Sequence, residues 1–254
     1  MSAQAREIKV AVFGDSISEG IGSRRLNYCT PLETILNKAG IQTEITNFAC
    51  TGTTIRFVET KESELKGKKY DYILVAYGNV DAMLRPDTNS KLNLYAHIPS
   101  RYKKTGMLNP RPYFSRVWYK SAIQHVDSWI RWNLNQCLLK MQGAITWVGP
   151  DEFRDTYQSA LNMLHDSTDR IIMLSTVHVS EKYFPGTNEM YIKYNSIIKE
   201  IAEKNQCAYI DLYDRLRGRS FYYEDEFHPN EAGYQCIADL IAGEILEDLD
   251  SEKL

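Results

Sequence analysis

The sequence predicts a three-layer α/β fold in which helices cover both faces of a parallel sheet. Near-continuous apolar runs such as IKVAVF, YILVAY and IIMLSTV favour strands that are buried on both faces, as strands of parallel sheets are. Longer amphipathic stretches separate these runs, and the alternation of strand and helix predicts right-handed crossover connections. A chain of 254 residues can bury one sizeable core, so a single domain over residues 1–254 is expected.

Individual elements follow from hydrophobic periodicity and from helix start and stop signals. Thr30, Pro31 and Glu33 form the pattern of an N-cap, a first-turn proline and a capping-box glutamate. Gly40 stands where that helix should end. Further helices are expected at residues 117–141, 152–165, 189–204 and 231–246, and a sheet of about five strands at residues 8–13, 41–48, 72–77, 171–177 and 208–211.

The connection between the third and fourth predicted strands is too long for one crossover helix, which indicates a helical insertion at about residues 85–168. Residues 85–120 include eight basic side chains, one acidic side chain and six interleaved aromatic rings. We expect this insertion to cover or extend a functional site. It can bind a sugar or an anionic substrate, because aromatic rings stack on sugars and arginine pairs with carboxylates. A solvated surface explains the composition equally well.

Charge and cysteine content argue against several classes of protein. The formal net charge of -3 gives no global electrostatic reason to bind nucleic acid or an anionic membrane. Five scattered cysteines, with no CxxC pair and no histidine at zinc-ligand spacing, argue against a disulfide framework and against a metal site. No stretch has the length and polarity of a signal peptide or a membrane span, so a cytoplasmic location is expected.

The loop after the first predicted strand, Gly14-Asp15-Ser16, is a candidate for chemistry. Open α/β sheets bind ligands at the carboxyl ends of their strands, and a glycine turn there would expose the Ser16 hydroxyl as a nucleophile. The loop lacks the Gly-Lys-Ser/Thr ending of a phosphate loop and the GxGxxG spacing of a dinucleotide site. A plainer alternative is that Asp15 and Ser16 only cap the next helix.

A partner for that serine stands near the other end of the chain, directly before the last predicted helix. Asp225 precedes His228 by three residues, so its carboxylate can accept a hydrogen bond from one imidazole nitrogen while the other faces Ser16. Pro229 stiffens this loop, and Asn230 can cap the following helix. The alternative is that His228 is a surface loop histidine.

Three segments together resemble blocks I, II and V of the SGNH hydrolases, also called the GDSL esterase/lipase family. These segments are Gly14-Asp15-Ser16, the stretch NFACTGTT at residues 47–54, and the DxxHPN pattern at residues 225–230. From the first segment to the last they span residues 14–230, which is nearly the whole chain. The resemblance implies one SGNH hydrolase-like domain with a flavodoxin-like α/β/α sandwich, hydrolysing acyl esters through a serine acyl-enzyme. It implies no metal and no organic cofactor.

The resemblance also implies roles for individual residues. Ser16 would be the nucleophile, His228 the general base and then acid, and Asp225 the carboxylate that orients the imidazole. Gly52 of the second block would join Ser16 in an oxyanion hole through the backbone N–H groups of both residues. A turn glycine between a strand and a helix is the plainer interpretation of Gly52.

The third block is where the sequence departs from the family. Most members have Gly-x-Asn-Asp, with the asparagine as an oxyanion donor, whereas this chain reads Gly78-Asn79-Val80-Asp81. In ungapped register Val80 takes the asparagine position and offers no side-chain donor. Asn79 is a candidate donor if the loop is shifted by one residue; otherwise the hole uses backbone donors alone. Asp81 is expected to brace the loop.

These residues predict a serine esterase that acts on short-chain acyl esters, with carbohydrate O-acetyl esters as one class of substrate. The expected partner is a small-molecule or carbohydrate ester, with no role for nucleic acid or membranes. Two alternatives remain open. One is an acyltransferase in which a sugar hydroxyl replaces water, using the same three side chains. The other is a catalytically silent binding module of the same fold, suggested by the altered third block.

Overall fold

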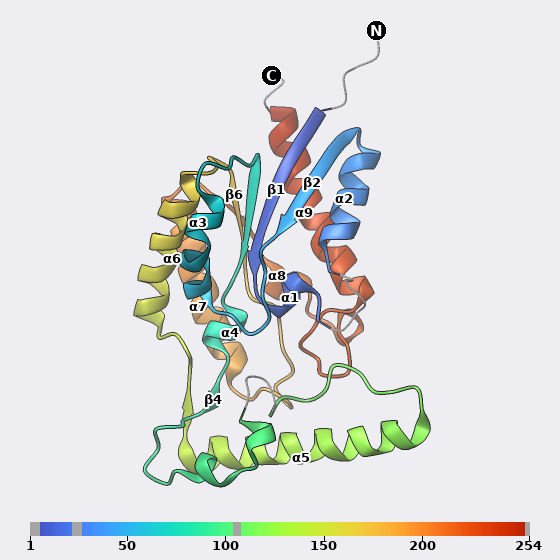
Figure 1. Ribbon diagram of the computed structural model, residues 1–254, viewed down its shortest axis with the longest axis vertical. Helices are drawn as coiled ribbons and strands as arrows, with labels where there is room; N and C mark the ends of the chain where they lie inside the picture. The colour runs from blue at the N-terminus through green and yellow to red at the C-terminus, as the bar shows by residue number, and fades with distance from the viewer. Residues whose placement is uncertain (1–5, 22–26, 104–107, 252–254) are drawn as a thin grey trace.

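The computed structural model describes residues 6–21, 27–103 and 108–251, and a parallel sheet of five strands lies at its centre (Figure 1). The strand order is β2-β1-β3-β6-β7, and every neighbouring pair is parallel. The α/β fold class and the predicted number of strands are therefore confirmed. The bounds are Arg6–Gly14 for β1, Ile41–Asn47 for β2, Tyr72–Ala76 for β3, Ile171–Leu174 for β6 and Ala208–Ile210 for β7.

The continuous apolar runs form the middle of this sheet because both of their faces are covered. All five residues of β3 are buried, and β1 is buried from Val10 to its end. Register pairs Val12 of β1 with Leu74 of β3, and Leu74 in turn with Ile172 of β6. The carboxyl ends of these three strands consequently lie at one edge of the sheet, where the loops that follow them meet.

Helices cover the sheet in two layers (Figure 1). Helices α2 (Cys29–Lys38) and α9 (Glu231–Ser251) lie on one side, while α6 (Pro150–His165) and α7 (Thr187–Lys204) lie on the other with the short η1 (Ile55–Lys61) and α3 (Glu62–Leu65). Their apolar faces contribute to the main core, with buried side chains that include Leu32, Leu161, Ile198 and Ile241.

The predicted start of α2 was wrong by two residues, since the N-cap is Tyr28 instead of Thr30. The helix begins at Cys29, so Thr30 is not its N-cap; instead the Oδ1 of Asn27 accepts a hydrogen bond from the N–H of Cys29 at 2.9 Å. Pro31 still lies in the first turn, where it has no N–H left to satisfy. The predicted stop is correct, because Gly40 follows the helix with a φ of +83°.

The segment between β3 and β6 leaves the sheet and returns through a short antiparallel ribbon. Strand β4 (Arg85–Pro86) pairs with β5 (Ala144–Ile145), and the long helix α5 (Trp118–Gln142) between them lies across the carboxyl-end side of the sheet (Figure 1). This excursion has a small apolar cluster of its own, centred on Tyr102, Leu108 and Leu138.

The expected insertion of residues 85–168 includes one element that belongs to the sheet layers. Helix α6 buries Phe153, Tyr157 and Leu161 in the main core and packs beside α7, so it is the crossover helix that leads to β6. The part that departs from the sheet therefore ends near β5. Sequence periodicity alone could not separate α5 from α6, because both helices are amphipathic and only their packing partners differ.

Candidate active site

The Gly14-Asp15-Ser16 turn follows directly from the end of β1. A Cβ on Gly14 would lie 2.2 Å from Ser18 Oγ and 3.2 Å from the carbonyl oxygen of Ala76, so only glycine fits there. Asp15 is the N-cap of helix α1 (Ser16–Glu19), its Oδ1 accepting the N–H of Ile17 at 2.9 Å. The capping alternative thus describes Asp15, while Ser16 is left as the first residue of the helix.

Ser16, His228 and Asp225 come together at this edge of the sheet. His228 Nε2 lies 3.0 Å from Ser16 Oγ, and His228 Nδ1 lies 2.6 Å from Asp225 Oδ2. Ser16 and Asp225 are buried, and 13% of the His228 side chain is exposed. The distances match those expected of a nucleophile, its base and an orienting carboxylate. The structure thus brings together three residues that sequence reasoning could only pair by pattern.

The loop that carries His228 is held by several hydrogen bonds. Asp225 Oδ1 accepts the backbone N–H groups of Phe227 and His228, each at 3.1 Å, so one carboxylate oxygen shapes the turn while the other orients the imidazole. Asn230 caps α9 through its Oδ1, which accepts N–H groups of Ala232 and Gly233 at 2.9 and 3.1 Å. The expected cap is confirmed, and it anchors the end of the loop.

The turn that follows β2 places Gly52 on the same cavity as Ser16. Gly52 has a φ of +74°, a left-handed conformation that glycine adopts without strain. Cys50 N–H donates to the carbonyl of Gly14 at 3.0 Å, and Thr51 N–H donates to a carboxylate oxygen of Glu19. These bonds tie the turn to β1 and α1. Gly52 and Ser16 consequently line the same cavity, as an oxyanion hole requires.

The third loop orients its two polar side chains away from that cavity. Asn79 is 3% exposed, and its Oδ1 accepts the N–H of Val177 at 2.9 Å. Its side chain also contacts Asp15, where burial raises the pKa of the carboxyl and the Asn79 side chain opposes that rise. Asn79 belongs to helix α4 (Asn79–Ala82), whose next residue, Val80, is the one that lines the cavity.

Asp81 stabilises the same loop through hydrogen bonds to backbone N–H groups. Its Oδ1 accepts the N–H of Ile55 at 2.9 Å and its Oδ2 the N–H of Gly78 at 3.0 Å. Burial raises the pKa of Asp81 to about 7, against those two hydrogen bonds, and the nearby Asp15 carboxyl raises it further. Burial likewise raises the pKa of Asp15 to about 6, opposed by the Ile17 N–H, Asn79 and His228. Two buried carboxyls therefore lie beneath the serine.

A cavity of about 220 Å³ opens above Ser16, and we call it the serine cavity. Three arginines, Arg85, Arg111 and Arg131, contribute to its walls, a clustering that the sequence does not predict. Two of them belong to the basic segment noted in the sequence, but Arg131 lies in the middle of α5 and has no local signal. Its walls also include Gly52, Val80, Met83, Pro110, Asp225 and His228.

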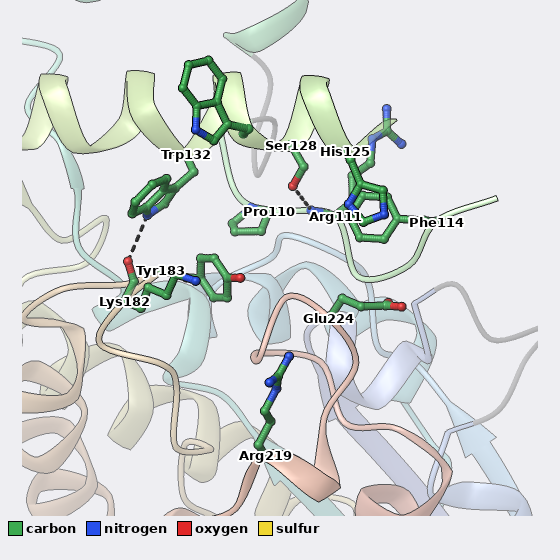
Figure 2. A pocket seen from close by; sticks show the side chains of 11 residues that line it. Pro110, Arg111, Phe114, His125, Ser128, Trp132, Lys182, Tyr183, Arg219 and Glu224 are labelled. Carbon is green, nitrogen blue, oxygen red and sulfur yellow. Dashed lines mark hydrogen bonds between the residues drawn. The ribbon is translucent and has the colours of Figure 1, made fainter. Parts of the chain in front are cut away.

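A second cavity of about 320 Å³, which we call the aromatic cavity, adjoins the first and shares Pro110 and Arg111 with it. Figure 2 shows His125, Ser128 and Trp132 reaching into it from α5, opposite Arg219. Phe114 stacks on His125 with 3.8 Å between ring centroids. Trp132 Nε1 donates to the carbonyl oxygen of Lys182 at 2.9 Å, which fixes the position of the indole.

Two further observations concern other classes of site. Within residues 6–21, 27–103 and 108–251, no group of three or more His, Cys, Asp or Glu side chains is arranged to hold a metal ion. In the same described part of the chain, no helix combines the length and the apolar character needed to cross a membrane.

A serine, a histidine and an aspartate at the carboxyl edge of a parallel α/β sheet form the arrangement that serine hydrolases use. The chain belongs to the GDSL-like lipase/acylhydrolase family, whose model matches residues 12–236. The predicted family is thereby confirmed, and with it the general class of ester hydrolases. No curated protein sequence matches the chain significantly.

Solved structures with a similar fold include acetylxylan esterases and an α/β hydrolase enzyme. An acetylxylan esterase from Geobacillus stearothermophilus has a TM-score of 0.60 and 16% sequence identity, covering 94% of each chain. An α/β hydrolase enzyme from the metagenome of Lake Arreo, Spain, has a TM-score of 0.59 and 16% identity, covering 94% of this chain and 95% of the other. An acetyl xylan esterase has a TM-score of 0.58 and 18% identity, covering 94% and 100%. At such identities the likeness establishes the fold.

Proposed function

We propose that this chain is a serine esterase that hydrolyses short-chain acyl esters, among them carbohydrate O-acetyl esters, through an acyl-enzyme on Ser16. The observation that carries the proposal is the 3.0 Å separation of Ser16 Oγ and His228 Nε2, with Asp225 at 2.6 Å from the other ring nitrogen. Family membership supports ester hydrolysis. The similar solved structures include acetylxylan esterases, which supports acetyl groups on sugars as a substrate class.

The geometry supports a two-step reaction. His228 Nε2 accepts the Ser16 proton as Oγ attacks the ester carbonyl carbon, and Asp225 stabilises the imidazolium that forms. The carbonyl oxygen gains negative charge and accepts hydrogen bonds from the N–H groups of Ser16 and Gly52. The imidazolium then donates its proton to the leaving alcohol oxygen, which departs as the acyl group remains on Ser16.

Water completes the cycle by the same route. His228 accepts a proton from the water as its oxygen attacks the acyl carbon, and a second oxyanion forms in the same hole. Ser16 Oγ then leaves and regains its proton from His228, releasing the carboxylic acid. We assign Asn79 a positioning role beneath this site, because its carboxamide contacts Val177 and Asp15 and Val80 faces the serine cavity.

The test uses p-nitrophenyl acetate hydrolysis and labelling by a fluorophosphonate, which reacts with activated serines. Wild type should be labelled and should turn over the ester, whereas Ser16→Ala should lose both. The matched control is Ser196→Ala, since Ser196 is an exposed helix serine on α7 that donates to the carbonyl of Ile192. Labelling and turnover that survive in Ser16→Ala would refute the proposed mechanism.

A further inference from the structure

The walls of the serine cavity carry more positive charge than their neighbouring carboxylates balance. Arg85, Arg111 and Arg131 all line it. Among the described residues that line it, the one carboxylate is Asp225, which is hydrogen-bonded to His228 and two backbone N–H groups. Since hydrolysis of a neutral ester needs no such cluster, the three guanidinium groups require a separate explanation.

Arg85 is the least balanced of the three. Its Nη1 donates to the carbonyl oxygens of Val80 and Met83 at 2.8 and 3.0 Å, and its guanidinium lies 3.7 Å from the ring centroid of Trp147. Within the described residues no carboxylate lies within ion-pairing distance of it. Burial lowers the pKa of Arg85 to about 10, so the side chain is still a cation at neutral pH.

The buried Asp81 carboxyl compensates for this charge only in part. The Asp81 carboxyl acts on Arg85, but its own pKa is raised to about 7 by burial. At neutral pH it therefore carries only a fraction of a negative charge. A half-buried guanidinium without a full counter-charge is costly to desolvate, and an anion in the cavity would remove that cost.

Arg111 and Arg131 share a single carboxylate. Arg131 Nε lies 2.8 Å and Arg111 Nη2 3.2 Å from Asp127 Oδ2, and Arg101 Nη2 lies 3.9 Å from Asp127 Oδ1. Burial opposes ionisation of Asp127, yet the Tyr102 hydroxyl, Arg131 and Arg111 together lower its pKa. Three cations around one anion leave a surplus of positive charge. Two of these cations face the serine cavity.

The adjoining aromatic cavity adds rings and further charged side chains. Beside the rings of Phe114 and Trp132 it presents Lys182, Glu224 and Arg219, the last of which lies 3.2 Å from Glu226 Oε1 in an ion pair. Because Arg111 belongs to both cavities, a molecule with its ester at Ser16 can extend past this guanidinium onto the aromatic rings. Aromatic faces together with guanidinium groups suit a sugar that carries an acidic group.

We propose that the natural substrate is an acidic ester, in which a carboxylate or phosphate on the alcohol moiety binds Arg85, Arg111 and Arg131 while the rest of that moiety occupies the aromatic cavity. The inference rests on the proposed esterase function, because it places the ester carbonyl at Ser16. Guanidinium groups bind both kinds of anion through paired N–H donors. Carboxylate and phosphate are therefore separate arms of the test.

The test compares acetyl esters of three sugars that differ in the charge of the group at carbon 6. The probes are a methyl glucoside, a methyl glucuronoside and a methyl glucoside 6-phosphate, each with one acetyl group on the same hydroxyl. An anionic probe should have a KM at least about tenfold lower than the neutral one, as expected for charge-assisted hydrogen bonds. Raising the salt concentration should narrow this difference. Equal KM values for all three probes would overturn the inference.

Variants identify the residues responsible. Arg85→Gln should reduce the ratio of neutral to anionic KM by about tenfold, and Arg85→Lys should retain part of it. Arg154→Gln is the control, because the ion pair of Arg154 with Glu200 lies on the surface of α6 and α7. A purely structural role of Arg85 would change the KM of all probes alike. That outcome would also contradict the inference.

Binding to Ser16→Ala separates the inference from the proposed function. Calorimetry measures the dissociation constants of the three acetylated probes for this variant without any turnover. Tighter binding of an anionic probe would support the acidic substrate even if wild type showed no esterase activity. Conversely, Ser16-dependent hydrolysis of p-nitrophenyl acetate with no preference for an anionic probe would leave the esterase proposal standing and remove only the inference.

Discussion

The Oδ1 atom of Asn79 accepts a hydrogen bond from the backbone N–H of Val177 at 2.9 Å. This bond joins the loops that follow β3 and β6, at the edge where Ser16 lies. Tyr191 adds a second tie, since its hydroxyl donates to the carbonyl oxygen of Asn79 at 2.8 Å. The asparagine of the third block is thus committed to holding two loops together.

Asn79→Ala should therefore act mainly on stability. Loss of the acceptor leaves the buried N–H of Val177 unpaired, which is expected to lower the free energy of unfolding by about 1 to 3 kcal/mol. Turnover per folded molecule should fall by less than about tenfold, whereas loss of an oxyanion donor typically costs about 100-fold or more. Denaturant unfolding and p-nitrophenyl acetate kinetics measure the two effects. A 100-fold loss of kcat at unchanged stability would instead assign Asn79 to the oxyanion hole.

Asp225→Asn should reduce kcat by about 1,000- to 10,000-fold with a change in KM of only a few-fold. The amide would present its NH₂ group to His228 Nδ1, so the imidazole proton would move to Nε2. A protonated Nε2 cannot accept the Ser16 proton. Asp214→Asn provides the control, because the ion pair of Asp214 with Arg217 is exposed. Steady-state kinetics decide the matter. Turnover close to that of wild type would show that Asp225 does not orient the base.

Asp81→Asn should reveal the raised pKa of Asp81 as a pH-dependent difference in stability. Burial raises that pKa from 3.8 to about 7, so folded protein binds more protons than unfolded protein between these values. The free energy of unfolding of wild type should therefore decrease as pH rises through this window. The variant lacks this titration, and its amide replaces one of the two acceptors for Ile55 and Gly78 N–H.

At pH 5 Asp81→Asn should be less stable than wild type by about 1 to 3 kcal/mol, and the deficit should shrink by pH 8. Denaturant unfolding at the two pH values measures both differences. A deficit that stays constant, or widens with pH, would show that Asp81 is ionised throughout this range.

Gly233→Ala should weaken the support of the histidine loop. A Cβ on Gly233 would lie 2.4 Å from the carbonyl oxygen of Phe221 and 2.8 Å from the Cβ of Pro229, which follows His228. Backbone must move to relieve the clash, at an expected cost of about 1 to 3 kcal/mol and with a loss of turnover. Gly243→Ala, on the same helix with nothing within 4 Å of its Cβ, should be stabilising by up to about 1 kcal/mol. In thermal unfolding, the Tm should fall for Gly233→Ala and rise for Gly243→Ala relative to wild type. Equal changes in Tm would contradict the steric argument.

The sheet and the three central residues of the site were predictable because their signals are local. Each buried strand is a short apolar run, and Ser16 and Gly52 follow the ends of such runs. Asp225 and His228 lie on one turn before a helix start. The rule that ligands bind at the carboxyl ends of parallel strands then brings the two ends of the chain to one place. The distance of 3.0 Å between Ser16 Oγ and His228 Nε2 is known only from the folded structure.

Other features depend on contacts between distant segments. Arg131 faces the serine cavity because α5 packs against the segment that carries Arg111, and both side chains reach Asp127. Nothing in the local sequence distinguishes this arginine from a solvated one on the same helix. The direction of Asn79 is likewise set by Val177, which lies 98 positions away. Such roles follow from tertiary packing rather than from periodicity.

The β4–β5 ribbon has a consequence for how this protein can change over evolutionary time. Arg85 lies opposite Ile145, so the chain leaves and rejoins the sheet layers at one point. The strands and helices that position Ser16 and His228 do not pass through the intervening excursion, yet Pro110 and Arg111 within it line the serine cavity. A change in the length or sequence of this segment would therefore alter side chains of the serine cavity while β1 and α9, which flank Ser16 and His228, keep their places in the fold.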